Sequence, residues 1–550
     1  MDASSLPFNT SMSADLSDAD ERERLAQVRP PQWQNPVPAA LYDLVVIGGG
    51  TAGLVAAHVA AGGGVKVALV ERHFLGGNCL NVGCVPSKTL IRTSRLYAEM
   101  RDAKRFGAQA PTDVPIDFAT VMQHMRGIRA RLSRTSSASE LTAAGVDVFF
   151  GRAHFTGATA LQVESATLHF RKAIIATGAR PDVPSIPGLA AAGFFTNERL
   201  FEITELPQRL LVIGGGALGC EMAQAFSRFG AHTTIVQNWP LFLPREERDA
   251  AQILSDAFAR DGIEVRLNTE VTGVRVEGGQ KFVDMVSDDY HSTIVVDAIL
   301  TGTGRVPNIE GLGLEAAGVS YDNKRGVHVD DYLRTSNRHI YAAGDVCLEL
   351  KFDDTADASA RIAVHNALHF GRRRFSELTI PWCSFTDPEV AHIGLYVRQA
   401  RELGIPVKTF TILMHDVDRA VVDGEEAGFV KIHVCEGSDR ILGATIVARH
   451  AGEMIGEITL AMVARVGLRA LSRVMHPYPT QSEAITKAAD ACCRTYRELT
   501  LLARLQRWLW RLPMALRLRR QNHPQSFFQS ARHADQGNDG ASAGQNEAHR

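Results

Sequence analysis

The chain has 550 residues, of which 45% are hydrophobic and 22% are charged, and its formal net charge is -2. This length exceeds what one hydrophobic core usually serves, so we expect two to four domains in an ordinary soluble globular protein. The small net charge excludes a global field that would favour nucleic acid, and eight cysteines are too few for a disulfide scaffold in a chain of this size.

The N-terminal segment, residues 1–40, is polar at first and then rich in proline. It has no basic stretch followed by an apolar run, so we predict no signal peptide and a cytoplasmic protein. We expect a poorly ordered arm with one short helix from Asp18 to Val28.

The segment Tyr42–Glu71 reads YDLVVIGGGTAGLVAAHVAAGGGVKVALVE. A short apolar strand, a glycine turn, an alanine-rich helix and a second strand follow one another, as in a βαβ nucleotide-binding unit. Gly48, Gly50 and Gly53 have the spacing that lets a pyrophosphate approach a helix N-terminus. Glu71 stands near the offset at which an acid binds a ribose hydroxyl, so we predict a dinucleotide site here.

A second copy of this pattern spans Arg209–Gln237, RLLVIGGGALGCEMAQAFSRFGAHTTIVQ. Its glycines are Gly214, Gly216 and Gly219, and the position equivalent to Glu71 is Gln237. The carboxylate that usually selects NAD is therefore absent, and no arginine follows directly. The sequence therefore does not predict whether the protein binds NADH or NADPH.

Between the two units lies Gly76–Lys88, GGNCLNVGCVPSK, which carries Cys79 and Cys84. On a regular helix this spacing would point the two thiols to different faces, so a bridge between them requires a loop or a distorted turn. Gly83 and Pro86 fit that requirement. A thiol at a helix start has a lowered pKa, which favours a redox-active pair over the alternative of two buried structural cysteines.

The pattern of apolar and polar residues changes after residue 375. Phe429–Cys435 alternates as a half-buried strand does, Ile441–His450 predicts a second strand, and amphipathic helices follow. The predicted fold class is α/β: two doubly wound nucleotide-binding domains plus a C-terminal α+β domain.

Four motifs together resemble the pyridine nucleotide-disulfide oxidoreductases: GGNCLNVGCVPSK, ATGARP at 176–181, TSNRHIYAAGDV at 335–346 and TDPEVAHIGL at 386–395. The resemblance covers about residues 42–491. It implies an FAD domain in two pieces with an NAD(P) domain inserted between them. The expected domains are an arm at 1–40, FAD-binding parts at 41–195 and 307–375, an NAD(P)-binding domain at 196–306, a dimerisation domain at 376–495, and a tail at 496–550.

The resemblance also implies bound FAD, NAD(P)H as co-substrate, and roles for single residues. Cys84 would face the flavin and Cys79 would be the exchange thiol, while Lys88 would lie near the flavin N5 and pair with Glu221. Lys88 is also a candidate cofactor contact, together with Thr177, Gly178, Gly304, Gly344 and Asp345.

The sequence departs from the family near its C-terminus, where HPYPTQSE runs from His476 to Glu483. Disulfide reductases of the family carry His-Pro-Thr-x-x-Glu, and counting back from Glu483 places Tyr478 at the histidine position. A histidine titrates near neutrality, whereas tyrosine is a poor base at pH 7. Mercuric reductase also has tyrosine there, so Tyr478 and Glu483 are candidate catalytic residues of a mercuric reductase-like branch.

Two features differ from mercuric reductase. Mercuric reductase ends in a vicinal cysteine pair, whereas Cys492 and Cys493 of this chain lie only 14 and 15 residues after Tyr478, in a predicted helix, KAADACCRTY, where packing is favoured over metal handling. Residues 1–41 contain no cysteine and hence no metal-binding CxxC. We expect the remaining cysteines to pack in cores, and we predict no resident metal. Those cysteines are Cys220, Cys347, Cys383 and Cys435.

The predicted function is a homodimeric oxidoreductase that passes electrons from NAD(P)H through FAD and the Cys79–Cys84 disulfide to a soft metal ion or a sulfur acceptor. One alternative is a dihydrolipoamide dehydrogenase-like disulfide reductase that uses His476. Another class is a membrane- or partner-associated flavoprotein that reduces a quinone or small acceptor without cysteine chemistry.

The tail contains an apolar stripe with tryptophan, beside arginines, over residues 501–520. This pattern is typical of an interfacial membrane helix, while packing on the protein body is the favoured alternative. The membrane hypothesis is a weak contact with the inner face of the membrane.

Overall fold

The computed structural model describes residues 18–109, 114–369 and 371–499. The chain divides into a compact unit that ends at Asp490 and a second unit formed by residues 491–550. In these described ranges, no helix combines the length and the apolarity that crossing a bilayer requires. The predicted amphipathic helix of residues 501–512 lies outside them, so the membrane hypothesis stays a prediction.

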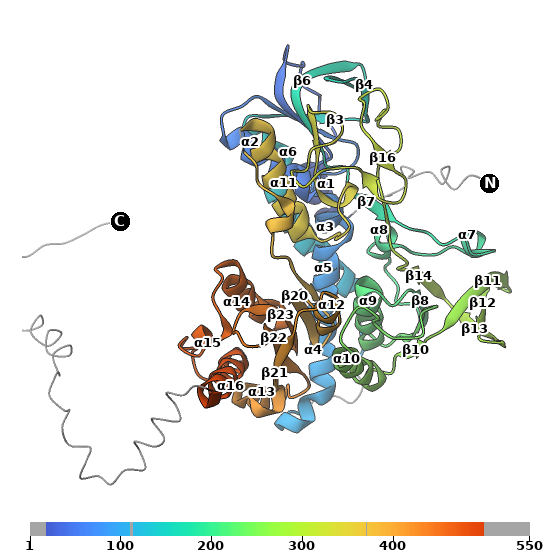
Figure 1. The fold of residues 1–550 in the computed structure, drawn as a ribbon. Helices are drawn as coiled ribbons and strands as arrows, with labels where there is room; N and C mark the ends of the chain where they lie inside the picture. The colour runs from blue at the N-terminus through green and yellow to red at the C-terminus, as the bar shows by residue number, and fades with distance from the viewer. Residues whose placement is uncertain (1–17, 110–113, 370, 500–550) are drawn as a thin grey trace, which may run out of the picture. The chain divides into compact units, whose positions relative to one another are not determined.

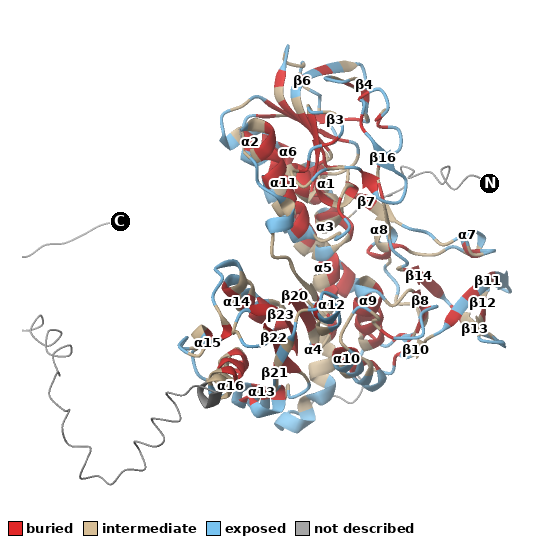
Figure 2. Ribbon diagram, in the orientation of Figure 1, coloured by how far each residue is buried: buried red, intermediate tan, exposed pale blue. Residues whose placement is uncertain are grey.

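The first predicted nucleotide-binding unit forms as expected. β1 (Tyr42–Ile47), α2 (Thr51–Gly62) and β2 (Val67–Glu71) follow one another, and β1 pairs in parallel with β2. β1 and β2 are apolar and buried between helices, in the region coloured red in Figure 2.

This first sheet has the order β3-β2-β1-β6-β5-β4, and β18 adds to it by pairing in parallel with β6. Because β18 comes from far later in the chain, two separated segments build one sheet (Figure 1). The other strands of the sheet are β3 (Val146–Phe150), β4 (Ala153–Gly157), β5 (Ala160–Val163), β6 (Ala166–Ile175) and β18 (Ile340–Ala342).

The second unit repeats the pattern with β8 (Arg209–Ile213), α9 (Ala217–Arg228) and β9 (His232–Val236). Its parallel sheet has the order β10-β9-β8-β14, with β10 (Glu264–Arg266) and β14 (Ala298–Thr301). Beside it an antiparallel sheet runs β11-β12-β13, made of β11 (Thr269–Glu277), β12 (Gln280–Ser287) and β13 (Tyr290–Val296).

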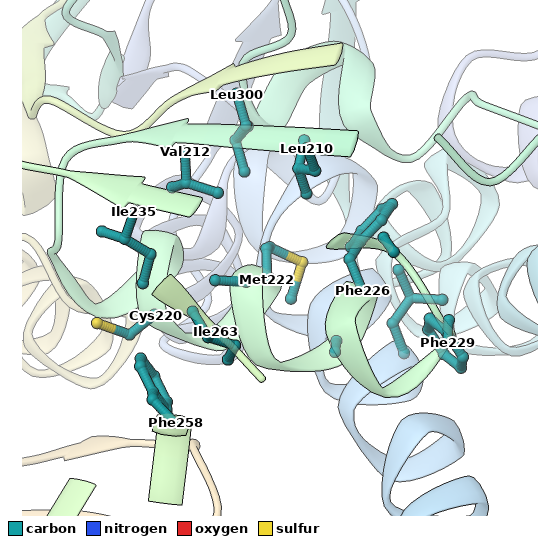
Figure 3. Close-up of a cluster of buried hydrophobic side chains, with 14 of the residues drawn as sticks. Leu210, Val212, Cys220, Met222, Phe226, Phe229, Ile235, Phe258, Ile263 and Leu300 are labelled. Carbon is teal, nitrogen blue, oxygen red and sulfur yellow. The ribbon is translucent and has the colours of Figure 1, made fainter. Parts of the chain in front are cut away.

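Apolar side chains fill the space between the second sheet and α9 (Figure 3). Leu210 and Val212 extend from β8 toward this core because alternate residues of a strand share one face. Cys220 is fully buried among these side chains, which confirms its predicted packing role.

The C-terminal domain has a five-stranded antiparallel sheet of order β19-β20-β23-β22-β21. The two predicted strands are present as β22 (Phe429–Cys435) and β23 (Ile441–Ala448). The half-buried alternation predicted for β22 is wrong at His433, which is 1% exposed because Glu247 from the second nucleotide-binding domain covers it at 3.0 Å. The remaining strands of the sheet are β19 (Pro381–Ser384), β20 (Glu389–Gly394) and β21 (Val407–Leu413).

Helices connect and cover these sheets. Those of the nucleotide-binding domains, after α3 and α4 described below, are α5 (Phe118–Ser133), α6 (Ala138–Ala143), α7 (Leu189–Ala192), α8 (Asn197–Leu200), α10 (Arg248–Arg260) and α11 (Asp353–Leu368). Those of the C-terminal domain are α12 (Val397–Glu402), α13 (Asp418–Asp423), α14 (Ala451–Val463), α15 (Leu468–Leu471) and α16 (Glu483–Leu499). Short strand pairs complete the fold: β7 (Ala179–Pro181) with β15 (Arg305–Pro307), and β16 (Tyr321–Asp322) with β17 (Gly326–Val327).

The expectation of a poorly ordered arm is wrong for residues 18–40. The predicted helix is present as α1 (Ala19–Val28), which begins at Asp18 because that side chain accepts from the first free N–H groups. Beyond it, Trp33 donates to the Val148 carbonyl at 3.2 Å, and Asn35 exchanges two 2.8 Å hydrogen bonds with the Phe150 backbone. The segment therefore packs along β3, the edge strand of the first sheet.

Candidate active site

The cysteine pair lies where one helix breaks and the next begins. Cys79 is in α3 (Gly77–Val82) and Cys84 is the first residue of α4 (Cys84–Asp102). Between them Gly83 has φ -136° and ψ -111°, outside the helical region. This break brings the two thiols together, and they hydrogen-bond to each other. The predicted distorted turn is confirmed.

When the reduced pair loses one proton, its surroundings favour the thiolate on Cys84. The hydrogen bond from Cys79 lowers the pKa of the Cys84 thiol, and the charge of Lys88 lowers it further. The start of α4 adds unpaired N–H groups and the positive end of the helix dipole, which also favour a thiolate. The pKa of Cys79 is raised, first by its bond to Cys84 and then by burial. One proton is thus held on Cys79 while Cys84 carries the charge.

Lys88, one turn after Cys84, forms the expected ion pair with Glu221 of α9. The Nζ to Oε2 distance is 2.9 Å, and the Glu221 side chain is buried. The other oxygen of Glu221 accepts the Phe385 N–H at 2.9 Å, and Lys88 lies 4.6 Å from the centre of the Phe385 ring. Three domains therefore hold one ammonium group beside the cysteine pair.

Asp353, the first residue of α11, is a site residue that the sequence analysis missed. Its Oδ1 accepts from the Thr51 hydroxyl at 2.6 Å at the start of α2, and its carboxylate hydrogen-bonds the Cys79 thiol. The sequence signal was weak: two successive acids at a helix start are ordinary, because acids favour that position. Only the packing of α11 against α2 brings this one to Cys79.

The first glycine turn fits a bound pyrophosphate. Gly48 has φ +106°, and a Cβ on Gly53 would lie 1.7 Å from the Gly48 carbonyl oxygen, so no side chain fits at either position. Gly50 precedes α2 without a side-chain cap, which leaves its first N–H groups for an anion. Glu71 accepts the Gly49 N–H at 2.6 Å, and its carboxylate lone pairs can still accept a ribose hydroxyl.

The other predicted FAD contacts lie around the same turn. The Gly48 backbone runs against Ala176 and Thr177, so the Thr177–Gly178 turn adjoins the glycine turn. Gly344, with φ +75°, packs against Ala52 of α2. Asp345 forms a 2.7 Å ion pair with Arg305, and burial raises its pKa. These residues fit FAD: the glycine turn and Glu71 would hold its adenosine and phosphates, and Asp345 and Lys88 would lie toward its flavin end.

The second glycine turn has the same geometry. Gly214 has φ +107°, and a Cβ on Gly219 would lie 2.1 Å from the Gly214 carbonyl oxygen. Gly216 precedes α9 without a side-chain cap, which again leaves N–H groups for a phosphate. Gln237 donates to the Leu241 carbonyl at 2.8 Å, and its Oε1 lies against Gly215. Gly304, the other predicted contact, follows β14 and has φ +128°. The turn from Gly214 to Gly219 fits the phosphates of NADH or NADPH.

Tyr478 and Glu483 lie in the C-terminal domain and have partners there. The Tyr478 hydroxyl donates to Asp418 of α13 at 2.8 Å, which raises the pKa of this exposed phenol. Glu483 begins α16 and pairs with Lys487 at 3.2 Å. The Tyr478 pair is not visible in the sequence because Asp418 is remote, whereas Glu483 and Lys487 have the i,i+4 spacing of an ion pair on a helix.

His476, the alternative base, is held away from such a role. Its Nε2 lies 2.8 Å from the Glu457 carboxylate of α14, and its Nδ1 lies 2.8 Å from the Thr486 hydroxyl. Both ring nitrogens are therefore engaged inside the domain. A histidine that serves an exchange thiol needs one nitrogen free to reach it.

The remaining cysteines are scattered. Cys492 and Cys493 are adjacent on α16, the former buried and the latter half-buried, as the helix prediction requires. Cys347, Cys383 and Cys435 are half-buried. Within residues 18–109, 114–369 and 371–499, no group of three or more His, Cys, Asp or Glu residues is arranged to hold a metal ion.

Two dinucleotide-binding sheets with a dithiol between them define a class of flavoprotein oxidoreductases. The chain belongs to the pyridine nucleotide-disulphide oxidoreductases: the family model matches residues 42–367, and the family's dimerisation-domain model matches residues 380–489. Members of this family contain FAD and use NAD(P)H as co-substrate. The predicted family, fold class and cofactors are confirmed.

The chain is similar to curated proteins of more than one activity. It is 34% identical to a mercuric reductase of Staphylococcus aureus over 82% of each chain. It is 33% identical to a dihydrolipoyl dehydrogenase of Thermus scotoductus over 82% of this chain and 97% of that one. Among solved structures, the Cu(II) complex of the HOCl-induced flavoprotein disulfide reductase RclA from Escherichia coli has a TM-score of 0.74 and 29% identity, over 82% of this chain and 100% of that one.

Proposed function

We propose that this protein uses NAD(P)H to reduce a soft metal ion, with Hg(II) as the first candidate, through Cys79 and Cys84. When bound, FAD supplies the two-electron link between the nicotinamide and the cysteine pair. Cys84 holds a thiolate, Lys88 and Glu221 fix a positive charge beside it, and Cys79 meets the acceptor. Thiolates are the ligands that a soft ion prefers.

The observation that carries this proposal is that the hydrogen bonds of His476 and Tyr478 leave neither side chain as a ready acid-base group. Reducing a disulfide requires a proton for the departing thiolate, which a histidine supplies well near neutral pH. Here both nitrogens of His476 are engaged, and Tyr478, beside the Asp418 carboxylate, keeps its proton. Reducing a metal ion needs no such proton. The mercuric reductases among the relatives, and the Cu(II) complex of RclA, support the same choice.

A disulfide reductase of the dihydrolipoamide dehydrogenase kind is the second candidate. The observation in its favour is Asp353, whose carboxylate accepts a hydrogen bond from the Cys79 thiol, where a disulfide reductase needs a polar partner for that thiol. The dihydrolipoyl dehydrogenase relatives support this reading.

We further propose a homodimer formed through the C-terminal domain. Large apolar side chains are exposed there, which is typical of a surface that another chain covers. They are Val421, Val422, Leu460, Val463 and Met475. In the proposed dimer, Tyr478 of one subunit serves the cysteine pair of the other.

The deciding experiment offers acceptors in parallel. Purified holoprotein is given NADPH or NADH with Hg(II), Cu(II), lipoamide, glutathione disulfide or a quinone, and nicotinamide oxidation is followed. We expect turnover with a metal ion to exceed that with every other acceptor. Faster turnover with lipoamide or glutathione disulfide would replace the proposal by the second candidate. Turnover with quinone alone, unaffected by removal of both cysteines, would reject cysteine chemistry.

The charge on Cys84 predicts a pH dependence. Because its pKa is lowered from the ordinary value near 9, the reduced protein should keep a thiolate-to-flavin absorption band at a pH where an ordinary thiol is protonated, and lose it as the pH falls through the lowered pKa. Replacing Lys88 by Met removes a nearby positive charge, so the midpoint should rise, by up to about one pH unit. A spectrophotometric titration measures it, and an unchanged midpoint would show that Lys88 does not stabilise the thiolate.

A further inference from the structure

A buried ionic network joins α1 to the segment that carries the two cysteines. Its members are Glu21 and Arg24 of α1, Asn81 of α3, and Arg129 of α5. Each is at most 5% exposed, and Arg24 is completely buried. Helix α1 precedes residue 42, where the match to the family model begins, so this network joins a segment outside that match to Asn81 and Arg129 inside it.

Arg24 contacts the redox segment directly. Its Nη1 donates to Asn81 Oδ1 at 2.5 Å, and its Nε donates to both Glu21 oxygens at 3.0 Å. Arg129 binds the same two residues, with 2.9 Å bonds to the Asn81 carbonyl and to Glu21. Although burial opposes it, the Arg24 hydrogen bonds and the Arg129 charge keep the pKa of Glu21 below its ordinary value. Asn81 lies between Cys79 and Cys84 in the chain.

Asn81 also hydrogen-bonds to the start of its own helix, α3. Its Nδ2 donates to the Leu75 carbonyl at 3.0 Å and to the Gly77 carbonyl at 2.9 Å. The end of α1 binds the same start, because the Leu75 N–H donates to the Val28 carbonyl at 3.1 Å. Both ends of α3 are therefore tied to α1.

Burying an arginine is costly unless its charge and donors are matched. A helix that only covered an apolar surface would need no such group, since leucine would pack without that cost. The planar guanidinium instead offers several donors in a fixed arrangement, which suits one side chain that must hold two partners at a set distance. We propose that Arg24 is a positioning residue for the redox pair: by gripping Asn81 it holds α3, and with it Cys79, in register with Cys84.

This inference rests on the proposed role of Cys79 and Cys84 as a redox pair. It has a chemical consequence, because the bond from Cys79 is the main cause of the lowered pKa of Cys84. If α3 loosens, that bond weakens and the Cys84 thiol becomes less acidic. Loss of stability alone would change the melting temperature and not the acidity of one thiol.

The test is Arg24→Met, which leaves Glu21 paired with Arg129 and so leaves no unmatched charge. The full-length protein is reduced, and the alkylation of Cys79 and Cys84 by iodoacetamide is measured against pH, with the modified residue located by mass spectrometry. We expect the midpoint for Cys84 to rise by about half a pH unit or more, which means a roughly threefold slower reaction at pH values below both midpoints. In the NAD(P)H-reduced holoprotein, the thiolate-to-flavin band should form more slowly while the first reduction phase is unchanged.

The matched control is Arg134→Gln, which breaks the exposed 2.5 Å ion pair of Glu23 on the same helix. It should behave as wild type. Arg24→Lys keeps the charge but cannot donate to two partners in a fixed arrangement, so it should raise the Cys84 midpoint by less than Arg24→Met does. If Arg24→Met does not fold, Arg24→Lys serves as the test. Wild-type midpoints in whichever of the two variants folds would overturn the inference. A wild-type protein in which neither thiol reacts below pH 8 would instead refute the proposed redox pair itself.

Discussion

Replacing Cys84 by Ser should abolish the thiolate-to-flavin absorption band and reduce turnover with every acceptor by roughly a thousandfold or more. The reason is that Cys84 holds the negative charge of the pair, at the start of α4 and beside Lys88. A serine hydroxyl does not ionise there near neutral pH. Rapid-mixing spectra with NAD(P)H measure the band, and steady-state nicotinamide oxidation measures turnover.

Two further variants make this result specific. Cys79→Ser should lose turnover but keep the band, because the serine hydroxyl can still donate a hydrogen bond to the Cys84 thiolate. Cys435→Ser changes a half-buried cysteine in β22 and should behave as wild type. If the band survives in Cys84→Ser and disappears in Cys79→Ser, the two thiols have exchanged their assigned roles.

Replacing Tyr478 by Phe should slow metal-ion turnover by roughly tenfold or more, as expected for the loss of one hydrogen bond to a charged group, and leave the reduction of the flavin by NAD(P)H unchanged. The hydroxyl is ordered by Asp418 at 2.8 Å and is exposed on the domain proposed to form the dimer. In the proposed dimer it would act at the cysteine pair of the other subunit. Single-turnover and steady-state rates separate the two half-reactions.

A suitable control for this variant is Tyr290→Phe, since Tyr290 in β13 is 73% exposed, as Tyr478 is. It should have no effect on either half-reaction. Asp418→Asn, which keeps the phenol but weakens its partner, should give an intermediate rate. Equal rates for Tyr478→Phe and wild type with all acceptors would remove Tyr478 from the site. Tyr478→His should raise disulfide reduction if the missing histidine is what limits it.

The local features of the molecule could be predicted from the sequence. The two glycine turns were predictable because their requirement is steric and lies within a few residues, as the contact between Gly53 and the Gly48 carbonyl shows. The broken helix at Gly83 is equally local. Helix α1 was also predictable, since Asp18 caps its first turn.

The environment of each charged side chain was decided by the tertiary structure. Sequence patterns predicted an arm before residue 41, but they could not show that Arg24 would be fully buried against Asn81. They gave no sign that Asp353 would contact Cys79, that Asp418 would bind Tyr478, or that His433 would be covered by Glu247. A glycine turn or a helix cap is satisfied by neighbours along the chain, so its cause is visible in the sequence. An ion pair between distant residues exists only after many weak packing contacts have brought two elements together, and no short stretch of sequence encodes their sum.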